Sequence, residues 1–124
     1  DGVAIVKEYG TGQELNIDKD LMKSCILNIF SNAFHAMERS GEKVLTIRAE
    51  KAGTEFVLSI KDTGTGVKAE NMPKVFEPFF TTKPGGLGLG LAITKRVIEE
   101  QGGRIEFYSS EGEGSEARLI FPIS

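Results

Sequence analysis

Two asparagines spaced four residues apart, Asn28 and Asn32, fall in a stretch whose apolar residues recur every three or four positions. On a helix this spacing puts both side chains on one face, about 6 Å apart along the axis, and His35 extends that face by one turn. Amide oxygens are hard neutral ligands that suit Mg²⁺, which takes the rest of its shell from water and phosphate. A solvated polar face explains the same residues at least as well, so the spacing alone does not decide.

The segment 62–66, Asp-Thr-Gly-Thr-Gly, directly follows a predicted strand. Glycines at such a turn allow positive φ angles and let a planar ligand approach the backbone. The carboxylate of Asp62 could accept a hydrogen bond from an exocyclic amine. Because Asp and Gly are also common in surface turns, a base-binding site and an ordinary turn both remain open.

A glycine-rich run at 86–91, Gly-Leu-Gly-Leu-Gly-Leu, opens a predicted helix. Free backbone N–H groups and the helix dipole favour a phosphate there, and Lys83 adds a positive charge just upstream. The sixth position is Leu91, so the run lacks the pattern of dinucleotide-binding units, and the chain has no P-loop pattern either. A flexible hinge is the alternative interpretation of this run.

Three rings, Phe76, Phe79 and Phe80, stand in a stretch otherwise poor in apolar residues. Core packing of one or two rings is the default, and a lid that folds over a ligand needs the same anchors. Between residues 62 and 90 the apolar residues show neither a helical nor a strand period, except for a possible short helix near 68–75. Since long loops in compact domains are usually functional, we predict a lid over about 66–88.

The remaining elements must hold these motifs in place. Extended runs at 3–8 and 14–17 precede a helix over 18–39, with Asp18 as its N-cap and Gly41 as its stop. Alternating runs at 44–50 and 55–61 predict a hairpin through Gly53, and runs at 104–109 and 116–122 predict another. A helix over 89–101 ends at the Gly102-Gly103 pair. The apolar stripe of the predicted first helix is Met22, Ile26, Ile29, Ala33 and Met37. In the run at 55–61, the residues that share the inner face are Phe56, Leu58 and Ile60.

The composition is that of an ordinary single domain. The chain has 124 residues, 40% hydrophobic and 27% charged, with a formal net charge of −3. No apolar run approaches the roughly 20 residues that span a bilayer, and no basic stripe is present, so we expect no direct membrane contact and no nucleic acid partner. Cys25 is the single cysteine, which excludes a disulfide framework and makes a cytoplasmic setting the default.

Four segments in order, 28–37, 62–67, 76–83 and 86–91, resemble the N, G1, F and G2 boxes of the histidine kinase ATPase domain. That domain belongs to the GHKL superfamily, shared with gyrase, mismatch-repair ATPases and heat-shock chaperone ATPases. The similarity covers essentially the whole chain, and Phe-Phe-Thr-Thr-Lys at 79–83 looks like the nitrogen-regulation branch. It implies an α/β fold: a two-layer sandwich of Bergerat type, with a mixed, mostly antiparallel sheet covered on one face by helices.

The resemblance also implies a role for each matching residue, with ATP between the first helix and the lid. Asn32 would hold Mg²⁺, with Asn28 close to the metal and the phosphates. Asp62 would read the adenine amine with help from the Ser115 hydroxyl, and Lys83 would act on the phosphates. The other positions that it places around ATP are His35, Ala36, Gly64, Gly66, Val67, Phe80, Thr81, Thr82, Gly86, Leu87, Gly88, Leu89 and Gly90.

Three positions depart from the family pattern. His35 stands where many members have Lys, which makes a phosphate contact there less certain. Leu87 replaces the commoner Thr, which removes a hydroxyl and leaves the backbone N–H donors intact. Ala117 occupies a place often held by an aromatic residue, a difference of packing.

The resemblance places Asn28 where hydrolytic members of the superfamily have Glu. Because an amide cannot accept a proton near neutral pH, this favours phosphoryl transfer over rapid ATP hydrolysis. The family's phosphoacceptor lies on an upstream helical dimerisation domain, and His35 followed by Ala36 does not match its context. We therefore expect residues 1–124 to be one catalytic domain, without that upstream domain, that binds ATP and does not phosphorylate itself.

The expected partners follow from the same resemblance. They are the histidine-bearing domain of the same protein and the receiver domain of a response regulator. We expect the isolated domain to be monomeric, and the parent to be a homodimer that could be membrane-anchored. Two alternatives stay open: a serine/threonine protein kinase of the anti-sigma type with the same fold, and a degenerate module that only binds a nucleotide or a partner.

Overall fold

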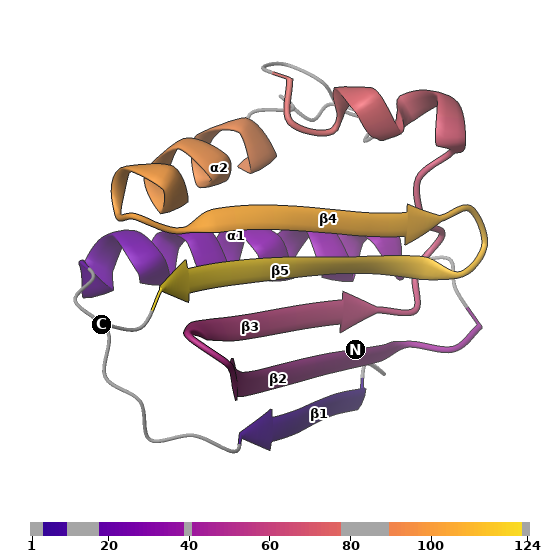
Figure 1. Cartoon of the computed structure of the whole chain (residues 1–124). Coiled ribbons are helices and arrows are strands. Elements are labelled where there is room, and N and C mark those ends of the chain that lie inside the picture. Colours follow the sequence, from indigo (N-terminus) through magenta and orange to yellow (C-terminus); the bar gives the residue numbers. More distant parts are fainter. Residues whose placement is uncertain (1–3, 10–17, 39–40, 78–89, 123–124) are drawn as a thin grey trace.

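A computed structural model describes residues 4–9, 18–38, 41–77 and 90–122. Within these residues, five strands form one sheet in the order β1-β2-β3-β5-β4 (Figure 1). β1 is parallel to β2, and the other neighbouring pairs are antiparallel. The elements are β1 (Ala4–Tyr9), α1 (Lys19–Ala36), β2 (Val44–Ala52), β3 (Glu55–Asp62), a 3₁₀ helix η1 (Ala69–Lys74), α2 (Gly90–Glu100), β4 (Arg104–Ser110) and β5 (Gly114–Pro122). The predicted two-layer sandwich with a mixed, mostly antiparallel sheet is confirmed.

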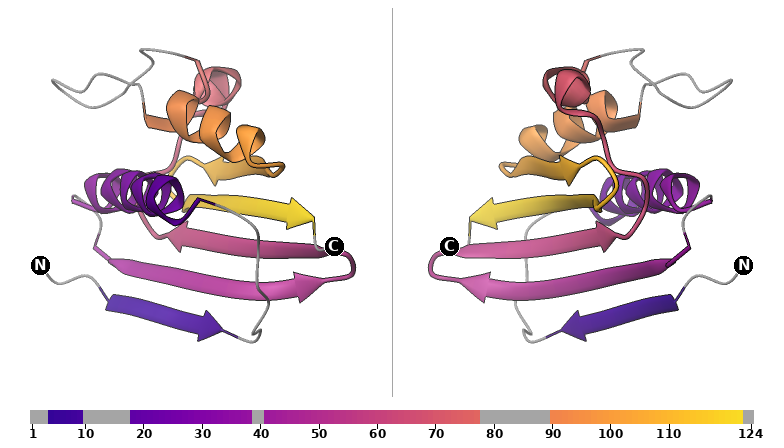
Figure 2. Two further views of the ribbon diagram at one scale, coloured as in Figure 1. Left: turned by 90° about the vertical axis from the view of Figure 1, so that its left-hand side faces the viewer. Right: turned by 90° about the vertical axis from the view of Figure 1, so that its right-hand side faces the viewer.

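One apolar core joins the two layers, and Figure 2 shows α1 and α2 beside the twisted sheet. Along β2, the buried Leu45 and Ile47 alternate with more exposed neighbours, as the period of two requires. The predicted inner face of β3 is confirmed, since Ile60 is buried and Phe56 and Leu58 pack against the core. The buried cluster is Met22, Cys25, Ile29, Ala33, Met37, Leu45, Ile47, Ile60, Ile98, Ile105, Ala117, Leu119 and Phe121.

The first helix begins where the sequence predicts, but it ends earlier in the chain than predicted. The Asp18 carboxylate accepts the N–H groups of Asp20 and Leu21 at 3.0 and 3.1 Å, which is an N-cap. The prediction that α1 reaches residue 39 is wrong, because the helix ends at Ala36 with Met37 as its C-cap. The Ala36 carbonyl accepts the Thr65 N–H at 3.0 Å, and the Met37 side chain is fully buried, so long-range contacts end α1 before Gly41.

The remaining boundaries agree with the predictions to within about two residues. The short helix near 68–75 is the 3₁₀ helix η1, and Gly102 follows α2 with φ +87°. The Gly103 N–H returns to the Ile98 carbonyl at 3.0 Å, which closes the helix end. Two predicted features lie outside the described residues: the extended run at 14–17 and the part of the lid over 78–88. No helix in the described parts of the chain is long and apolar enough to cross a membrane.

The topology gathers several chain segments at one end of the sheet. In Figure 1 the carboxyl end of β3, the β4–β5 turn and η1 lie at the same end, where α1 also finishes. Asp62 is the last residue of β3 and pairs with Ser115 near the start of β5. The predicted base-binding segment therefore lies beside the end of the first helix.

Candidate functional site

Asp62 is a buried carboxylate at the end of β3, with an exposed fraction of 6%. One of its oxygens, Oδ1, accepts the Gly64 N–H at 2.8 Å. Burial raises the pKa of Asp62 above its ordinary value, and hydrogen bonds from the backbone N–H groups of Gly64 and Ser115 oppose that rise. The side chain therefore keeps its place through main-chain donors.

No cation contributes to the pKa shift of Asp62 among the described residues. A buried carboxylate without an ion pair is unfavourable unless hydrogen bonds satisfy it. Its two oxygens offer about four acceptor sites, which is more than the two backbone donors fill. The group can thus accept a further hydrogen bond from a ligand that brings an N–H donor.

The loop that follows Asp62 is packed tightly against neighbouring backbone. A Cβ on Gly64 would lie 2.6 Å from the Ala36 carbonyl oxygen, and a Cβ on Gly66 would lie 2.0 Å from that of Ser110. Thr65 donates to Ala36 and accepts from the Gly112 N–H at 2.7 Å, so the loop joins α1 to the β4–β5 turn. Close packing thus explains why Gly64 and Gly66 lack a side chain. The approach of a nucleotide base to them stays a prediction.

A pair of hydroxyls lies beside Asp62. The hydroxyls of Ser109 and Ser115 are 2.8 Å apart, and Ser109 also donates to the Gly114 carbonyl at 2.9 Å and accepts the Val67 N–H at 2.7 Å. Because each hydroxyl has one proton, Ser115 donates to Ser109 whenever Ser109 donates to Gly114. The hydroxyl of Ser115 is therefore turned toward Ser109, and its backbone N–H is the group that bonds to Asp62.

The polar face of α1 approaches the second helix. Asn28 and Asn32 are partly exposed, and the Asn28 amide donates through Nδ2 to Oγ1 of Thr94 at 3.2 Å. Asn32 also has a polar contact within the protein. His35 forms a contact of 3.5 Å from Nδ1 to Oε1 of Glu38. The three predicted residues are thus on the helix as expected, and Thr94 is a neighbour that the sequence analysis did not identify.

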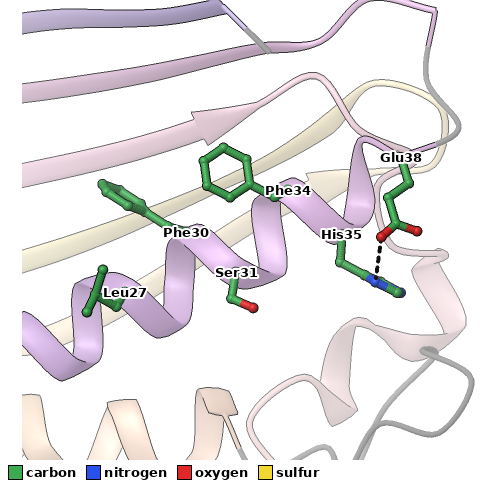
Figure 3. A pocket seen from close by; sticks show the side chains of 6 residues that line it. All are labelled: Leu27, Phe30, Ser31, Phe34, His35 and Glu38. Atoms are coloured by element: carbon green, nitrogen blue, oxygen red, sulfur yellow. Dashed lines mark ion pairs between the residues drawn. The ribbon is translucent and has the colours of Figure 1, made fainter. Parts of the chain in front are cut away.

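An open hollow of about 400 Å³ lies along the outer side of α1 (Figure 3). It shares only His35 with the predicted ATP-binding residues. Its lining residues are Leu27, Phe30, Ser31, Phe34, His35 and Glu38. Within the described parts of the chain, no group of three or more His, Cys, Asp and Glu side chains could hold a metal ion.

Much of the predicted phosphate-binding region falls outside the described residues. The positions concerned are Phe80, Thr81, Thr82, Lys83, Gly86, Leu87, Gly88 and Leu89. Gly90 is described as the first residue of α2. Phe76, within the predicted lid segment of 66–88, packs against the core, and Lys95 Nζ lies 5.9 Å from its ring centroid.

Comparisons with known proteins agree with this arrangement. Residues 17–124 match the family described as "Histidine kinase-, DNA gyrase B-, and HSP90-like ATPase". The chain therefore belongs to this family, and its resemblance to sensor histidine kinases is confirmed by its relatives. Sensor histidine kinase ZraS of Escherichia coli is 36% identical over 111 residues, which are 90% of this chain and 23% of that protein.

Two solved structures extend the comparison to the fold. The catalytic domain of histidine kinase ThkA has a TM-score of 0.82 and 29% identity, covering 98% of this chain and 80% of that one. Full-length ShkA, solved in complex with AMPPNP, has a TM-score of 0.84 and 26% identity, covering 99% of this chain and 26% of that one. Since the chain spans only about a quarter of full-length relatives such as ZraS (23%), the upstream domain and the nitrogen-regulation branch stay predictions.

Proposed function

We propose that the chain binds Mg-ATP and supplies the γ-phosphoryl group to a histidine on another domain of the same protein. The observation that carries this proposal is Asp62, a buried carboxylate bonded only to backbone N–H groups among the described residues. It has acceptor capacity for the exocyclic amine of adenine, which is an N–H donor. ShkA supports the proposal, because a chain of similar fold is complexed with AMPPNP, an analogue of ATP.

The residues on α1 fit a magnesium ion. Asn28 and Asn32 offer neutral amide oxygens from one partly exposed face, and Mg²⁺ prefers oxygen ligands together with water and phosphate. When bound, the ion would neutralise charge on the phosphates during transfer. We propose Asn32 as its direct protein ligand and Asn28 as a residue close to the metal and the phosphates.

The protein's own part in the reaction is to hold and orient the nucleotide. Asp62 would fix the adenine, and Asn28, which carries no basic group, would leave water unactivated. Lys83, with Thr82 and the glycine-rich run that ends at Gly90, would bind the phosphates, while Ser115 would steady Asp62 through its backbone N–H. Phosphoryl transfer then requires a nucleophile brought by another domain, and hydrolysis stays slow.

The proposal extends to the parent protein. The acceptor histidine would lie on an upstream dimerisation domain, the parent would be a homodimer working in the cytoplasm, and the phosphoryl group would pass on to a response regulator. The single domain, without that histidine, is expected to bind ATP as a monomer without phosphorylating itself. A buried carboxylate that still has acceptor capacity supports nucleotide binding over a degenerate module that keeps only the fold.

Calorimetric titration of ADP with and without Mg²⁺ tests the metal assignment. We expect Asn32→Ala to reduce the Mg²⁺-dependent gain in ADP affinity about tenfold, equivalent to about 1.4 kcal/mol. Its ADP affinity without Mg²⁺ should stay within about twofold of that of the unmodified chain. Ser31→Ala, a change on the exposed side of the same helix, is the matched control and should resemble the unmodified chain. An equal loss with and without Mg²⁺ would assign Asn32 to another role. No binding of Mg-ADP by the unmodified chain would refute the proposed function.

A further inference from the structure

Thr94 is a polar side chain enclosed between the two helices. Its exposed fraction is 1%, and it lies on α2 four residues after Gly90, where the predicted lid region joins the helix. Its hydroxyl oxygen accepts the Asn28 Nδ2–H group from α1 at 3.2 Å. Thr94 therefore connects the helix that follows the lid with the helix that carries the proposed metal site.

The Thr94 hydroxyl has a second partner in the core. Burial raises the pKa of the Cys25 thiol, and a hydrogen bond with the Thr94 side chain opposes the rise. A hydroxyl has one proton and two lone pairs, so Thr94 can accept from Asn28 while it also bonds to Cys25. Toward Asn28, Thr94 is the acceptor, and it contacts the N–H end of the amide.

This contact orients Asn28. The nitrogen and the oxygen of an amide point in different directions from the same carbon, so holding Nδ2 at Thr94 directs Oδ1 away from Thr94. A rotated amide would face Thr94 with its oxygen, and that contact would need the single hydroxyl proton that the bond to Cys25 can also use. The Asn28 oxygen thus points away from Thr94, as a ligand of a cation must, and the N–H end is held at Thr94.

We propose that Thr94 is a positioning residue that holds the Asn28 oxygen ready for Mg²⁺ and the phosphates bound with it. This inference rests on the proposed function and adds a residue that acts only through Asn28. It also makes the orientation of a metal-site residue depend on the placement of α2. The consequence is that removal of one buried hydroxyl reduces Mg²⁺-dependent binding while the nucleotide base is still held.

Two variants at Thr94 separate the hydroxyl from the packing. Thr94→Val keeps the branched shape and removes the hydroxyl, whereas Thr94→Ser keeps the hydroxyl. In calorimetry, we expect Thr94→Val to reduce the Mg²⁺-dependent gain in ADP affinity about tenfold and Thr94→Ser to stay within about threefold of the unmodified chain. ADP affinity without Mg²⁺ should be equal in all three proteins. A gain that is unchanged in Thr94→Val, with Mg-ADP still bound by the unmodified chain, refutes the positioning role alone.

A double-mutant cycle with Asn28→Ala distinguishes positioning from a general loss of structure. If Thr94 acts through Asn28, Thr94→Val removes nothing further once Asn28→Ala is present. Losses that add in the double variant, in parallel with a lower thermal unfolding midpoint, would show a merely structural role. If the unmodified chain shows no ADP binding at all, the proposed function itself fails.

A second readout needs no change at Thr94. The side-chain amide resonances of Asn28 are identified in NMR spectra by their absence from Asn28→Ala. One of the two N–H protons should exchange with water more slowly than the other, because only one is held in the partly buried hydrogen bond to Thr94. Equally fast exchange of both protons would overturn the proposed orientation.

Discussion

Asp62→Asn is expected to weaken the binding of Mg-ADP by about 10- to 100-fold while the chain stays folded. A hydrogen bond to a charged group contributes about 1.5–3 kcal/mol, which corresponds to that range of affinity. The amide can still accept the Gly64 N–H through its oxygen, and its NH₂ group cannot accept from the adenine amine. Calorimetric titration measures the loss, and Glu113→Gln, in the exposed β4–β5 turn, is the control. Unchanged affinity in Asp62→Asn would contradict the assignment.

The same substitution has an effect on stability whose sign follows from the pKa of Asp62. Burial raises that pKa in the folded state, so the unfolded chain loses its proton at lower pH than the folded chain does. Between the ordinary value of 3.8 and the raised pKa, stability therefore falls as pH rises, and above that window the penalty is constant. We expect Asp62→Asn to unfold in denaturant no earlier than the unmodified chain at pH 7. Any gain in stability of Asp62→Asn over the unmodified chain should shrink at pH values below this window. A variant that is markedly less stable than the unmodified chain at neutral pH would contradict the prediction.

Gly66→Ala is expected to lower the free energy of unfolding by about 2–5 kcal/mol, the sum of a left-handed backbone and an overpacked contact. Gly66 has φ +72°, and a Cβ there would lie 2.0 Å from the Ser110 carbonyl oxygen. Neither backbone can yield easily, because the segment is tied to α1 and to the β4–β5 turn through Thr65.

Gly53→Ala provides the matched control for this prediction. Gly53 has φ +65° in the β2–β3 turn, and a Cβ added there would meet no atom within 4 Å, so only the backbone strain of about 1–2 kcal/mol remains. Urea denaturation of the two variants isolates the clash as their difference. Equal losses at both glycines would show that the close contact with Ser110 is not a feature of the folded chain.

Regular elements of this fold are predictable from the sequence because each repeats its signal several times. Met22, Ile29 and Ala33 mark the buried stripe of α1 at helical spacing, and the alternation in β3 marks its inner face. The end of α1 is not predictable in this way. It depends on the Ala36 carbonyl bonding to Thr65, a contact between segments that only the fold brings together.

The residues of the candidate site likewise differ in whether the sequence alone predicts them. Asp62 stands out in the sequence through its motif, but its burial and its bond to the Ser115 backbone depend on the register of β3 against β5. Ser109 and Thr94 carry no signal of their own, since a serine at a strand end and a threonine in a helix are both common. Only the alternation of the predicted hairpin, combined with its register, could have placed Ser109 beside Ser115.

Adenine recognition by Asp62 is tested most directly by comparing ADP with IDP, in which an oxygen replaces the exocyclic amine. With Mg²⁺ present, the unmodified chain should bind ADP about 10- to 100-fold more tightly than IDP, because only ADP brings the N–H donor that the carboxylate accepts. In Asp62→Asn this preference should largely disappear. Equal affinity of the unmodified chain for ADP and IDP, or the same preference in both proteins, would contradict the assignment.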